Sequence, residues 1–263
     1  PAPAAEPEGV PPRSVRIAGG VAGHIHPAAC GTRDGTVLVV HSKADFKDLR
    51  LTRSSDGGRT WSESVPFPGT EKLDIYPGSL TTLRDGRVVL AWNTWFKPDT
   101  GDKSRFVQFS ISGDGGKTWS EPRSLAKNPD AQSVIRHPIL ELPDGWLFSL
   151  SDRTVVYDPK TGEERPFADG QKHGLVPIVR TAKGTLVSGS GRRSTDGGKT
   201  WTTTAARNFP ARLQYDTIDD IRWDPAAPGY AIIALGSGEC WRTRSEGAWW
   251  EPIARQTRAT RVL

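Results

Sequence analysis

Short apolar runs separated by turns that contain glycine and proline dominate the pattern of this chain. The longest runs, such as 37–40 (VLVV) and 230–235 (YAIIAL), have the length of a strand, and none approaches the 18 or more apolar residues of a membrane span. The 28 glycines and 21 prolines favour many short strands joined by tight turns over helices. The pattern therefore predicts an all-β fold without a membrane span.

The apolar runs belong to a longer unit that recurs along the chain. Each unit has a proline, a strand, a turn of the form x-Gly and a second apolar strand. The first four units start at 24–40, 74–92, 134–150 and 174–189, and a fifth covers 221–253. Units of about 40–60 residues with four strands each are typical of propeller blades. We therefore expect a β-propeller of five blades; the alternative is a sixth blade that the two ends complete with the segments 15–19 and 258–263.

The octapeptide Ser-x-Asp-x-Gly-x-Thr-Trp occurs three times, at 54–61, 112–119 and 194–201. Glycine supplies the positive φ of a tight turn, and an aspartate there accepts hydrogen bonds from the amides that follow it. The tryptophan buries a large apolar face against the hairpin. We therefore expect the aspartates and tryptophans of the three octapeptides to have a structural role, and the aspartates not to be catalytic. These residues are Asp56, Trp61, Asp114, Trp119, Asp196 and Trp201.

Two units depart from this octapeptide. The third carries another plausible hairpin, 157–167, in its place. In the fifth, the segment 241–253 keeps Gly247 and Trp250 but has Ser245 in place of the aspartate and Glu246 in place of one glycine. We interpret it as an altered copy of the same turn.

Alternating strand direction divides the connections of a blade between two faces. The x-Gly turns and the octapeptides share one face, so the segments that lead into each first strand and the connections between second and third strands share the other, which we call the ring mouth. Ionisable and aromatic side chains gather on the segments of the ring mouth and form a plausible polar binding site. The candidate catalytic residues are Asp45, Tyr76, Asp152, Tyr215 and Asp216. The candidate binding residues are His24, His26, Lys43, Trp95, Arg136, His137, His173 and Arg192.

Each candidate also has a structural interpretation. Residues that precede a proline, such as His26, Tyr76 and His137, are able to pack the central tunnel, and Trp95 is able to pack within a blade. The histidines lack ligand spacing apart from the pair His24 and His26, so we expect no metal and no cofactor.

Composition narrows the function classes further. The net charge of +5 is modest and scattered, without a basic cluster among stacking aromatics, which argues against nucleic acid. The chain lacks methionine and opens on a Pro/Ala-rich stretch, so we expect a disordered leader at 1–13, a single propeller domain at 14–263 and an exported, processed protein. Cys30 and Cys240 either close the ring as a disulfide or remain two buried free thiols.

The octapeptides and the blade pattern resemble the Asp-box (BNR) repeat of sialidases and related β-propellers, from about residue 20 to residue 253. The resemblance implies three arginines that clamp a substrate carboxylate, an acid/base aspartate, and a tyrosine nucleophile paired with a glutamate. Asp45 matches the aspartate, Arg136 or Arg192 the third arginine, and Tyr215 or Tyr230 the nucleophile. Ile25 and Lys43 stand where the first two arginines are expected, and lysine is a point charge without the guanidinium fork.

These features together predict an exported carbohydrate-active propeller, either a sialidase-like glycoside hydrolase of altered specificity or a glycan-binding relative. Its expected partner is a carbohydrate or glycoconjugate, bound at the ring mouth. The alternative is a non-catalytic scaffold that binds protein, which the Asp-Pro-x-x-Pro pattern at 224–228 and the positive charge favour. Paired acid groups about 5–9 Å apart would indicate hydrolysis.

Overall fold

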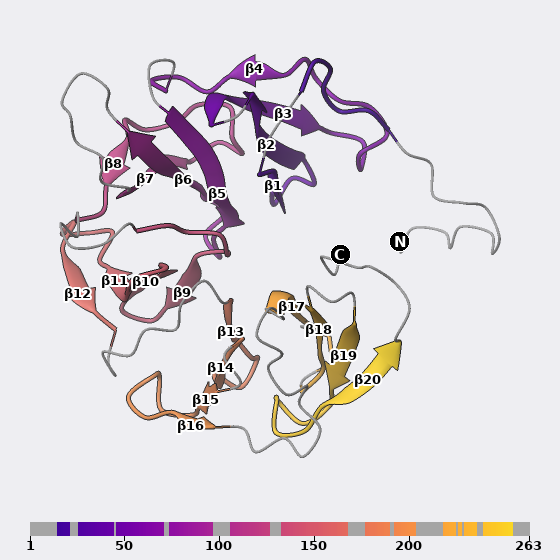
Figure 1. Cartoon of the computed structure of the whole chain (residues 1–263), viewed down its shortest axis with the longest axis vertical. Coiled ribbons are helices and arrows are strands. Elements are labelled where there is room, and N and C mark those ends of the chain that lie inside the picture. Colours follow the sequence, from indigo (N-terminus) through magenta and orange to yellow (C-terminus); the bar gives the residue numbers. More distant parts are fainter. Residues whose placement is uncertain are drawn as a thin grey trace.

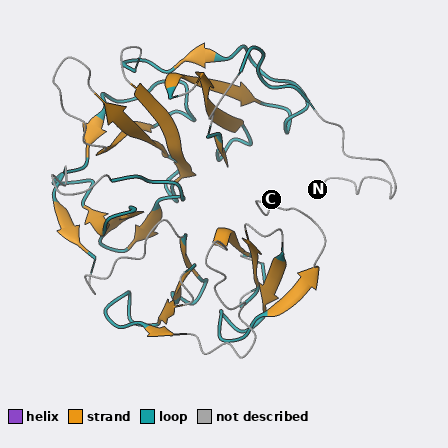
Figure 2. Ribbon diagram, in the orientation of Figure 1, coloured by secondary structure: helices purple, strands orange, loops and turns teal. Residues whose placement is uncertain are grey.

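Five four-stranded antiparallel sheets arranged around a ring make up the computed structural model (Figure 1). Among the residues that it describes there are strands, turns and loops but no helix, and hence no helix long and apolar enough to cross a membrane (Figure 2). The described residues are 15–21, 26–44, 46–70, 74–96, 106–126, 133–167, 177–189, 192–203, 218–224, 226–227, 229–235 and 239–254, without the side chains of 95, 96, 218–220 and 254.

Each sheet is a meander in which consecutive strands pair, and the first strand of each sheet lies nearest the centre of the ring (Figure 1). The strands, sheet by sheet, are β1 (Ala28–Gly31), β2 (Val37–Ala44), β3 (Lys47–Ser54) and β4 (Val65–Pro66); β5 (Asp74–Thr82), β6 (Val88–Phe96), β7 (Phe106–Ser112) and β8 (Arg123–Ser124); β9 (Leu140–Leu142), β10 (Gly145–Ser149), β11 (Thr154–Tyr157) and β12 (Glu164–Pro166); β13 (Ile178–Arg180), β14 (Leu186–Ser188), β15 (Arg192–Ser194) and β16 (Thr202–Thr203); β17 (Ile218–Trp223), β18 (Ala231–Leu235), β19 (Cys240–Thr243) and β20 (Glu251–Ala254).

The sheets confirm the five predicted blades. Residues 15–21 form no strand, so the alternative in which 15–19 helps to build a sixth blade is wrong for that segment; 258–263 and the expected leader 1–13 lie outside the described residues. Of the two possibilities for the cysteines, Cys30 and Cys240 are both free thiols and half-buried. Burial raises the pKa of the Cys30 thiol above its usual value.

Four apolar clusters join neighbouring blades. Removing large side chains from water in this way contributes about 1.5–3 kcal/mol for each fully buried residue before entropy is counted. Members of the clusters from successive sheet pairs are Leu38 and Trp92, Phe109 and Phe148, Leu147 and Leu186, and Val187 and Ile233. Among the described residues no such cluster joins the fifth sheet to the first.

The three octapeptides form nearly identical turns between the third and fourth strands of their sheets. In the first, the Ser54 hydroxyl donates to Asp56 Oδ1 at 2.7 Å and accepts from the Gly58 amide at 2.8 Å. The Asp56 carboxylate also accepts from the Thr60 amide at 2.9 Å and the Thr60 hydroxyl at 2.6 Å, and Trp61 Nε1 donates to the Gly58 carbonyl at 3.0 Å. The same bonds recur in the second and fourth sheets, so each aspartate is occupied within its own turn.

The fifth sheet carries the altered turn that its sequence predicts. The Thr243 hydroxyl accepts from the Gly247 amide at 3.1 Å, as the octapeptide serines do. The Ser245 hydroxyl accepts from the Trp249 amide at 2.9 Å and so replaces the aspartate oxygen. Glu246 has φ 55°, in the positive region that Gly57 occupies with φ 73° in the first turn. A neutral hydroxyl therefore holds this turn where carboxylates hold the other three.

The second glycine of each turn touches the preceding blade, except in the first sheet. A Cβ built on Gly116 would lie 2.5 Å from Leu38 Cδ1 of the first sheet, and one on Gly198 would lie 2.2 Å from Phe167 Cζ of the third. A Cβ on Gly247 would lie 3.3 Å from Val187 of the fourth sheet. At Gly58 the only such contact is with its own turn, at 3.7 Å. These glycines allow the turns to seat against the neighbouring sheet.

Alanine substitutions at two of these glycines separate backbone strain from this close approach. Gly58 and Gly116 have φ 90° and 84°, so alanine at either is expected to cost about 1–2 kcal/mol of unfolding free energy through the left-handed backbone alone. Gly116→Ala is expected to lose about 1–3 kcal/mol more, because the new methyl group overlaps Leu38. Urea denaturation of both variants measures the difference, and equal losses would contradict the inter-blade contact.

Acid should destabilise the turns that use carboxylates. The Thr60 hydroxyl and amide lower the pKa of Asp56 in the folded state, and threonines act in the same way on Asp114 and Asp196. A lowered folded pKa means that the stabilisation is complete above the unfolded value of about 4 and is lost as the pH falls through the lower folded value.

The variant Asp196→Ser, which copies the natural residue at position 245, is therefore expected to reduce the slope of unfolding free energy against pH between about pH 4 and pH 2. Urea titrations at several pH values measure that slope. A slope that matches the unmodified protein would show that the turn carboxylate does not govern acid stability.

Candidate functional site

The strand order places the start of each first strand and the end of each second strand at one edge of the sheets, opposite the octapeptide turns. Backbone contacts show how closely the first two blades approach there. The Ile75 amide donates to the Phe46 carbonyl at 2.6 Å, so the connection from β2 to β3 lies against the beginning of β5. This part of the ring mouth is therefore shared by two blades.

Three aromatic rings lie together at this junction. The centroids of His26 and Tyr76 are 4.7 Å apart, those of Phe46 and Tyr76 are 5.4 Å apart, and those of His26 and Phe46 are 6.4 Å apart. Tyr76 is buried, at 3% exposure, whereas His26 and Phe46 are half-buried. The outer two rings thus lie against a tyrosine that the fold covers, and we call the three residues the mouth platform.

The backbone of the mouth platform is unusual as well. His26 has φ 38° and Phe46 has φ 54°, and Asp48 at the start of β3 has φ 53°. Residues other than glycine seldom adopt such values, and where they do the surrounding structure must hold them there. Strained residues of this kind concentrate at functional sites. Three of the four such residues in the described part of the chain belong to this corner of the ring mouth.

The charged residues beside the mouth platform form local pairs. Lys47 Nζ lies 3.8 Å from Asp74 Oδ1, and Arg50 Nη1 donates to both carboxylate oxygens of Asp48 at 3.1 Å. The Lys47 side chain is largely exposed, so that pair contributes little stability. The Lys47–Asp74 pair joins the first blade to the start of β5 beside Tyr76, whereas the Arg50–Asp48 pair lies within β3.

The lead-in to the third blade is held firmly by Asn93. The Asn93 side chain is buried, donates to the Ile135 carbonyl at 2.9 Å and accepts from the Ile135 amide at 2.7 Å. Gly78 permits this approach, because a Cβ at that position would lie 2.4 Å from Ile135 Cγ2. The next residue, Arg136, is exposed, and His137 is half-buried. Asn93 therefore fixes the backbone that presents Arg136 and His137.

Asp152, a candidate catalytic residue, is buried beside Arg153 on the connection from β10 to β11. Arg153 Nη1 donates to Asp152 Oδ2 and to the Ser133 hydroxyl, each at 2.8 Å. The Val134 amide donates to Ser151 Oγ at 3.0 Å. These bonds tie the connection to the lead-in segment of the same blade, so Asp152 lies at the ring-mouth edge of the third sheet.

The remaining predicted residues are distributed as follows. Arg192 begins β15 and is half-buried. Trp95 lies in β6, and its side chain is outside the described part of the structure. His24, Asp45, His173, Tyr215 and Asp216 lie outside the described residues altogether. Among the described residues no three His, Cys, Asp or Glu side chains are grouped so as to hold a metal ion.

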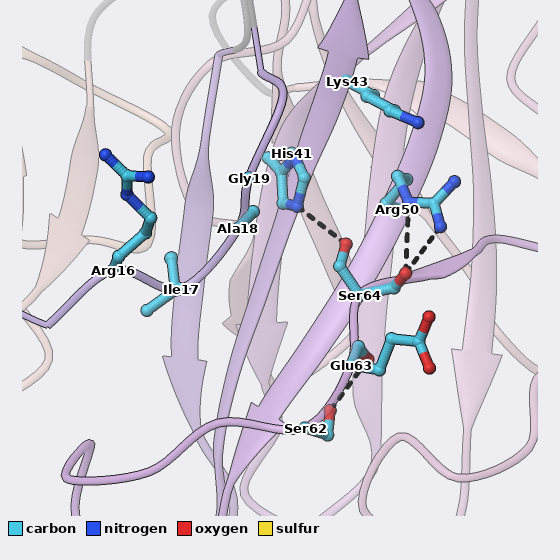
Figure 3. Close-up of a pocket in the computed structure, with 10 residues that line it drawn as sticks. All are labelled: Arg16, Ile17, Ala18, Gly19, His41, Lys43, Arg50, Ser62, Glu63 and Ser64. Atoms are coloured by element: carbon cyan, nitrogen blue, oxygen red, sulfur yellow. Dashed lines mark hydrogen bonds between the residues drawn. The ribbon is translucent and has the colours of Figure 1, made fainter.

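Lys43, the residue at the position expected for the second arginine, lines a pocket on the flank of the first blade (Figure 3). The pocket has a volume of about 400 Å³ and lies between residues 16–19 and the outer strands of the first sheet. The side chains of Lys43 and Arg50 project from neighbouring strands beside His41, which bonds to Ser64 (Figure 3). The structure thus separates Lys43 from the mouth platform.

Sequence reasoning missed Phe46 and Asn93. Phe46 follows Asp45 in a short connection, and nothing in a single aromatic residue indicates its positive φ or its neighbours. Asn93, which the sequence analysis does not single out, is buried in β6. The available signal was a polar residue, Asn93, directly after the apolar run 88–92.

Two bacterial sialidases are similar in sequence to this chain. The sialidase of Clostridium perfringens is 24% identical over 239 residues, which cover 79% of this chain and 57% of the relative. The sialidase of Bacteroides fragilis is 29% identical over 163 residues, which cover 50% of this chain and 29% of the relative. This chain therefore spans little more than half of the first relative and less than a third of the second.

The fold is also found in a solved α-L-arabinofuranosidase of Fusarium graminearum, with a TM-score of 0.61 and 16% identity over 89% of this chain and 82% of that one. No protein-family model matches the chain. The sequence similarity to the two sialidases and the ring of five antiparallel sheets together support a sialidase-like β-propeller superfamily for this chain.

Proposed function

We propose that this protein is an exported carbohydrate-active propeller that holds a saccharide at the ring mouth, against the mouth platform. Its relatives support the class of ligand: two are sialidases, and the arabinofuranosidase was solved with arabinobiose. The platform supports the position, because it is the described part of the ring mouth where aromatic faces, paired charges and strained backbone coincide.

The single observation that carries this proposal is the arrangement of half-buried His26 and Phe46 over buried Tyr76. An aromatic face offers the apolar C–H side of a sugar ring a flat partner with little conformational entropy to lose. Lys47 and Asp74 at the edge offer a donor and an acceptor for hydroxyl groups. Stacking against a preformed platform with polar groups at its rim is how such sites combine affinity with orientation.

Hydrolysis is the catalytic version of this proposal. Asp45 immediately precedes Phe46 in the chain, so a saccharide on the mouth platform would lie near the connection that carries Asp45. In this version Asp45 protonates the leaving oxygen, and a second acid group such as Asp152 or Asp216 completes the pair. Tyr76 fits the nucleophile role poorly, because it is buried at 3% exposure against the rings of His26 and Phe46.

Substitution of Phe46 tests the binding site directly. Phe46→Ala is expected to weaken saccharide binding about three- to tenfold, because it removes a stacking face, while Phe46→Tyr keeps the ring and the affinity. A glycan array identifies a saccharide, and calorimetric titration with it compares the variants. Val65→Ala, on an exposed residue of the outer strand of the same blade, is the matched control. Equal affinity in Phe46→Ala and Val65→Ala, with unchanged melting temperatures, would place the saccharide elsewhere.

Substitution of Asp45 tests hydrolysis. In a panel of aryl glycosides, Asp45→Asn is expected to lower kcat by about 10²–10⁴-fold while KM changes little, because it removes a proton donor and not a binding contact. Asp48→Asn, at the start of β3, is the control for a general loss of charge. Turnover that persists in Asp45→Asn would exclude the proposed acid, and saccharide binding without turnover in the unmodified protein would leave the binding version.

One observation favours the second candidate function, a scaffold for protein partners. Trp249 and Ile253 of the fifth blade are large apolar residues with 43% and 44% exposure, at the outer edge of the ring. Exposed apolar residues at a rim are suited to protein contacts. A stable protein partner that is lost in Trp249→Ser, together with an empty glycan array, would favour this function over the first.

A further inference from the structure

The flank of the first blade that faces away from the second is polar. Side chains alternate along β2, so Leu38 and Val40 face the second blade, while His41 and Lys43 face the opposite way. Arg50 pairs with His41 across β2 and β3 and lies on the same side. Among the described residues no apolar cluster joins this flank to the fifth blade.

The floor of the flank pocket is rigid and fully bonded. His41 is buried at 3% exposure, and its ring nitrogens lie 3.0 Å from the Ser64 hydroxyl and 3.2 Å from the Ser42 carbonyl. Arg50 donates to the Ser64 carbonyl from Nε at 3.2 Å and from Nη2 at 2.6 Å, and its Nη1 binds Asp48 (Figure 3). Hydrogen bonds therefore hold both side chains before any ligand arrives.

Two further cations line the pocket without an ion pair among the described residues. Lys43 and Arg16 are both exposed, one on the sheet and one on the segment that crosses it. Glu63 is the carboxylate that lines the same pocket, and Asp48 compensates the charge of Arg50. The pocket thus presents more positive than negative charge, with serine hydroxyls at 62 and 64 beside it.

We propose that this flank pocket is a second binding site, which takes an oxyanion: a carboxylate or sulfate group, either free or on a small saccharide. Lys43, beside Arg50, would bind the anionic oxygens through charge-assisted hydrogen bonds, whereas Arg16, whose side chain lies on the far side of the pocket and points away from Lys43 (Figure 3), would add positive potential. Glu63 and the serines would bind neighbouring hydroxyl groups. The volume of about 400 Å³ lies within the range of small-ligand sites, so one sugar residue fits.

This site is distinct from the ring mouth. Its walls come from β2, β3 and the segment that leads into β4, together with residues 16–19, and not from the first strands nearest the ring centre (Figure 3). The inference rests on the pocket and its charges alone, so it does not depend on saccharide binding at the mouth platform.

Direct binding measurements test the flank pocket. We would titrate the full chain with glucuronate, with inorganic sulfate and with neutral glucose, at low and at physiological ionic strength. Glucuronate or sulfate is expected to bind, more weakly as salt rises, and glucose at least about tenfold more weakly than glucuronate. Preference for glucuronate identifies an acidic saccharide as the ligand, and preference for sulfate identifies a free anion; both support an oxyanion site.

Matched variants connect that binding to the pocket. The double variant Arg16→Gln with Lys43→Gln is expected to lower the affinity by about tenfold or more. The control, Lys160→Gln with Lys199→Gln, removes the same charge from exposed residues in the third and fourth blades. Thermal denaturation checks that both variants fold. Equal affinity in the two double variants, or no binding of either anion to the unmodified protein, would overturn the proposal.

Discussion

The close seating of the octapeptide turns of the second and fourth sheets, and of the altered turn of the fifth, against the preceding blade is the constraint on which this ring depends. In these three turns a serine or threonine hydroxyl accepts a hydrogen bond from the amide of the second glycine, and that glycine brings the turn to within van der Waals reach of the sheet before it. The apolar clusters then fill the space between sheets. The second glycine therefore takes part both in the hydrogen bonding of its own turn and in the packing between blades. This explains why the turn recurs even where its aspartate has changed.

The fifth turn shows which part of the motif this packing requires. Ser245 replaces the aspartate and Glu246 replaces a glycine with positive φ, yet Gly247 still contacts Val187. Glu246 gains partners that a glycine lacks, since its carboxylate accepts from Thr185 and lies 3.7 Å from Lys183 of the fourth blade. A bridge between blades thus accompanies the backbone strain at this position. The hydroxyl and the second glycine remain, whereas the carboxylate varies.

Much of this architecture was predictable from sequence because its determinants are local. The octapeptides, the x-Gly turns and the altered copy around Ser245 each encode a turn within about ten residues, and counting them gives five blades. The mouth platform was less accessible, because His26, Phe46 and Tyr76 meet through backbone conformations that no local pattern reveals. The flank pocket was missed for a related reason: the position of residues 16–19 beside β2 and β3 depends on packing between segments distant in sequence.

The two candidate sites belong to different levels of the fold. The mouth platform lies where two blades meet near the ring centre, so its geometry depends on their relative placement. The flank pocket belongs mainly to the first blade, whose strands supply the bonded floor. Binding at the mouth platform therefore depends on the contact between two blades. Binding at the flank pocket depends on one sheet and the segment that crosses it.

The absence, among the described residues, of an apolar cluster between the fifth and first sheets has a mechanical consequence. The stability of the fold is then a sum over blades and the interfaces between consecutive blades, as in a linear repeat protein. The second, third and fourth sheets have two such neighbours, while the first and fifth have one. Transient opening should therefore start at these two terminal units and travel inward, and amide exchange would be fastest in the sheet that carries the flank pocket and in the fifth sheet.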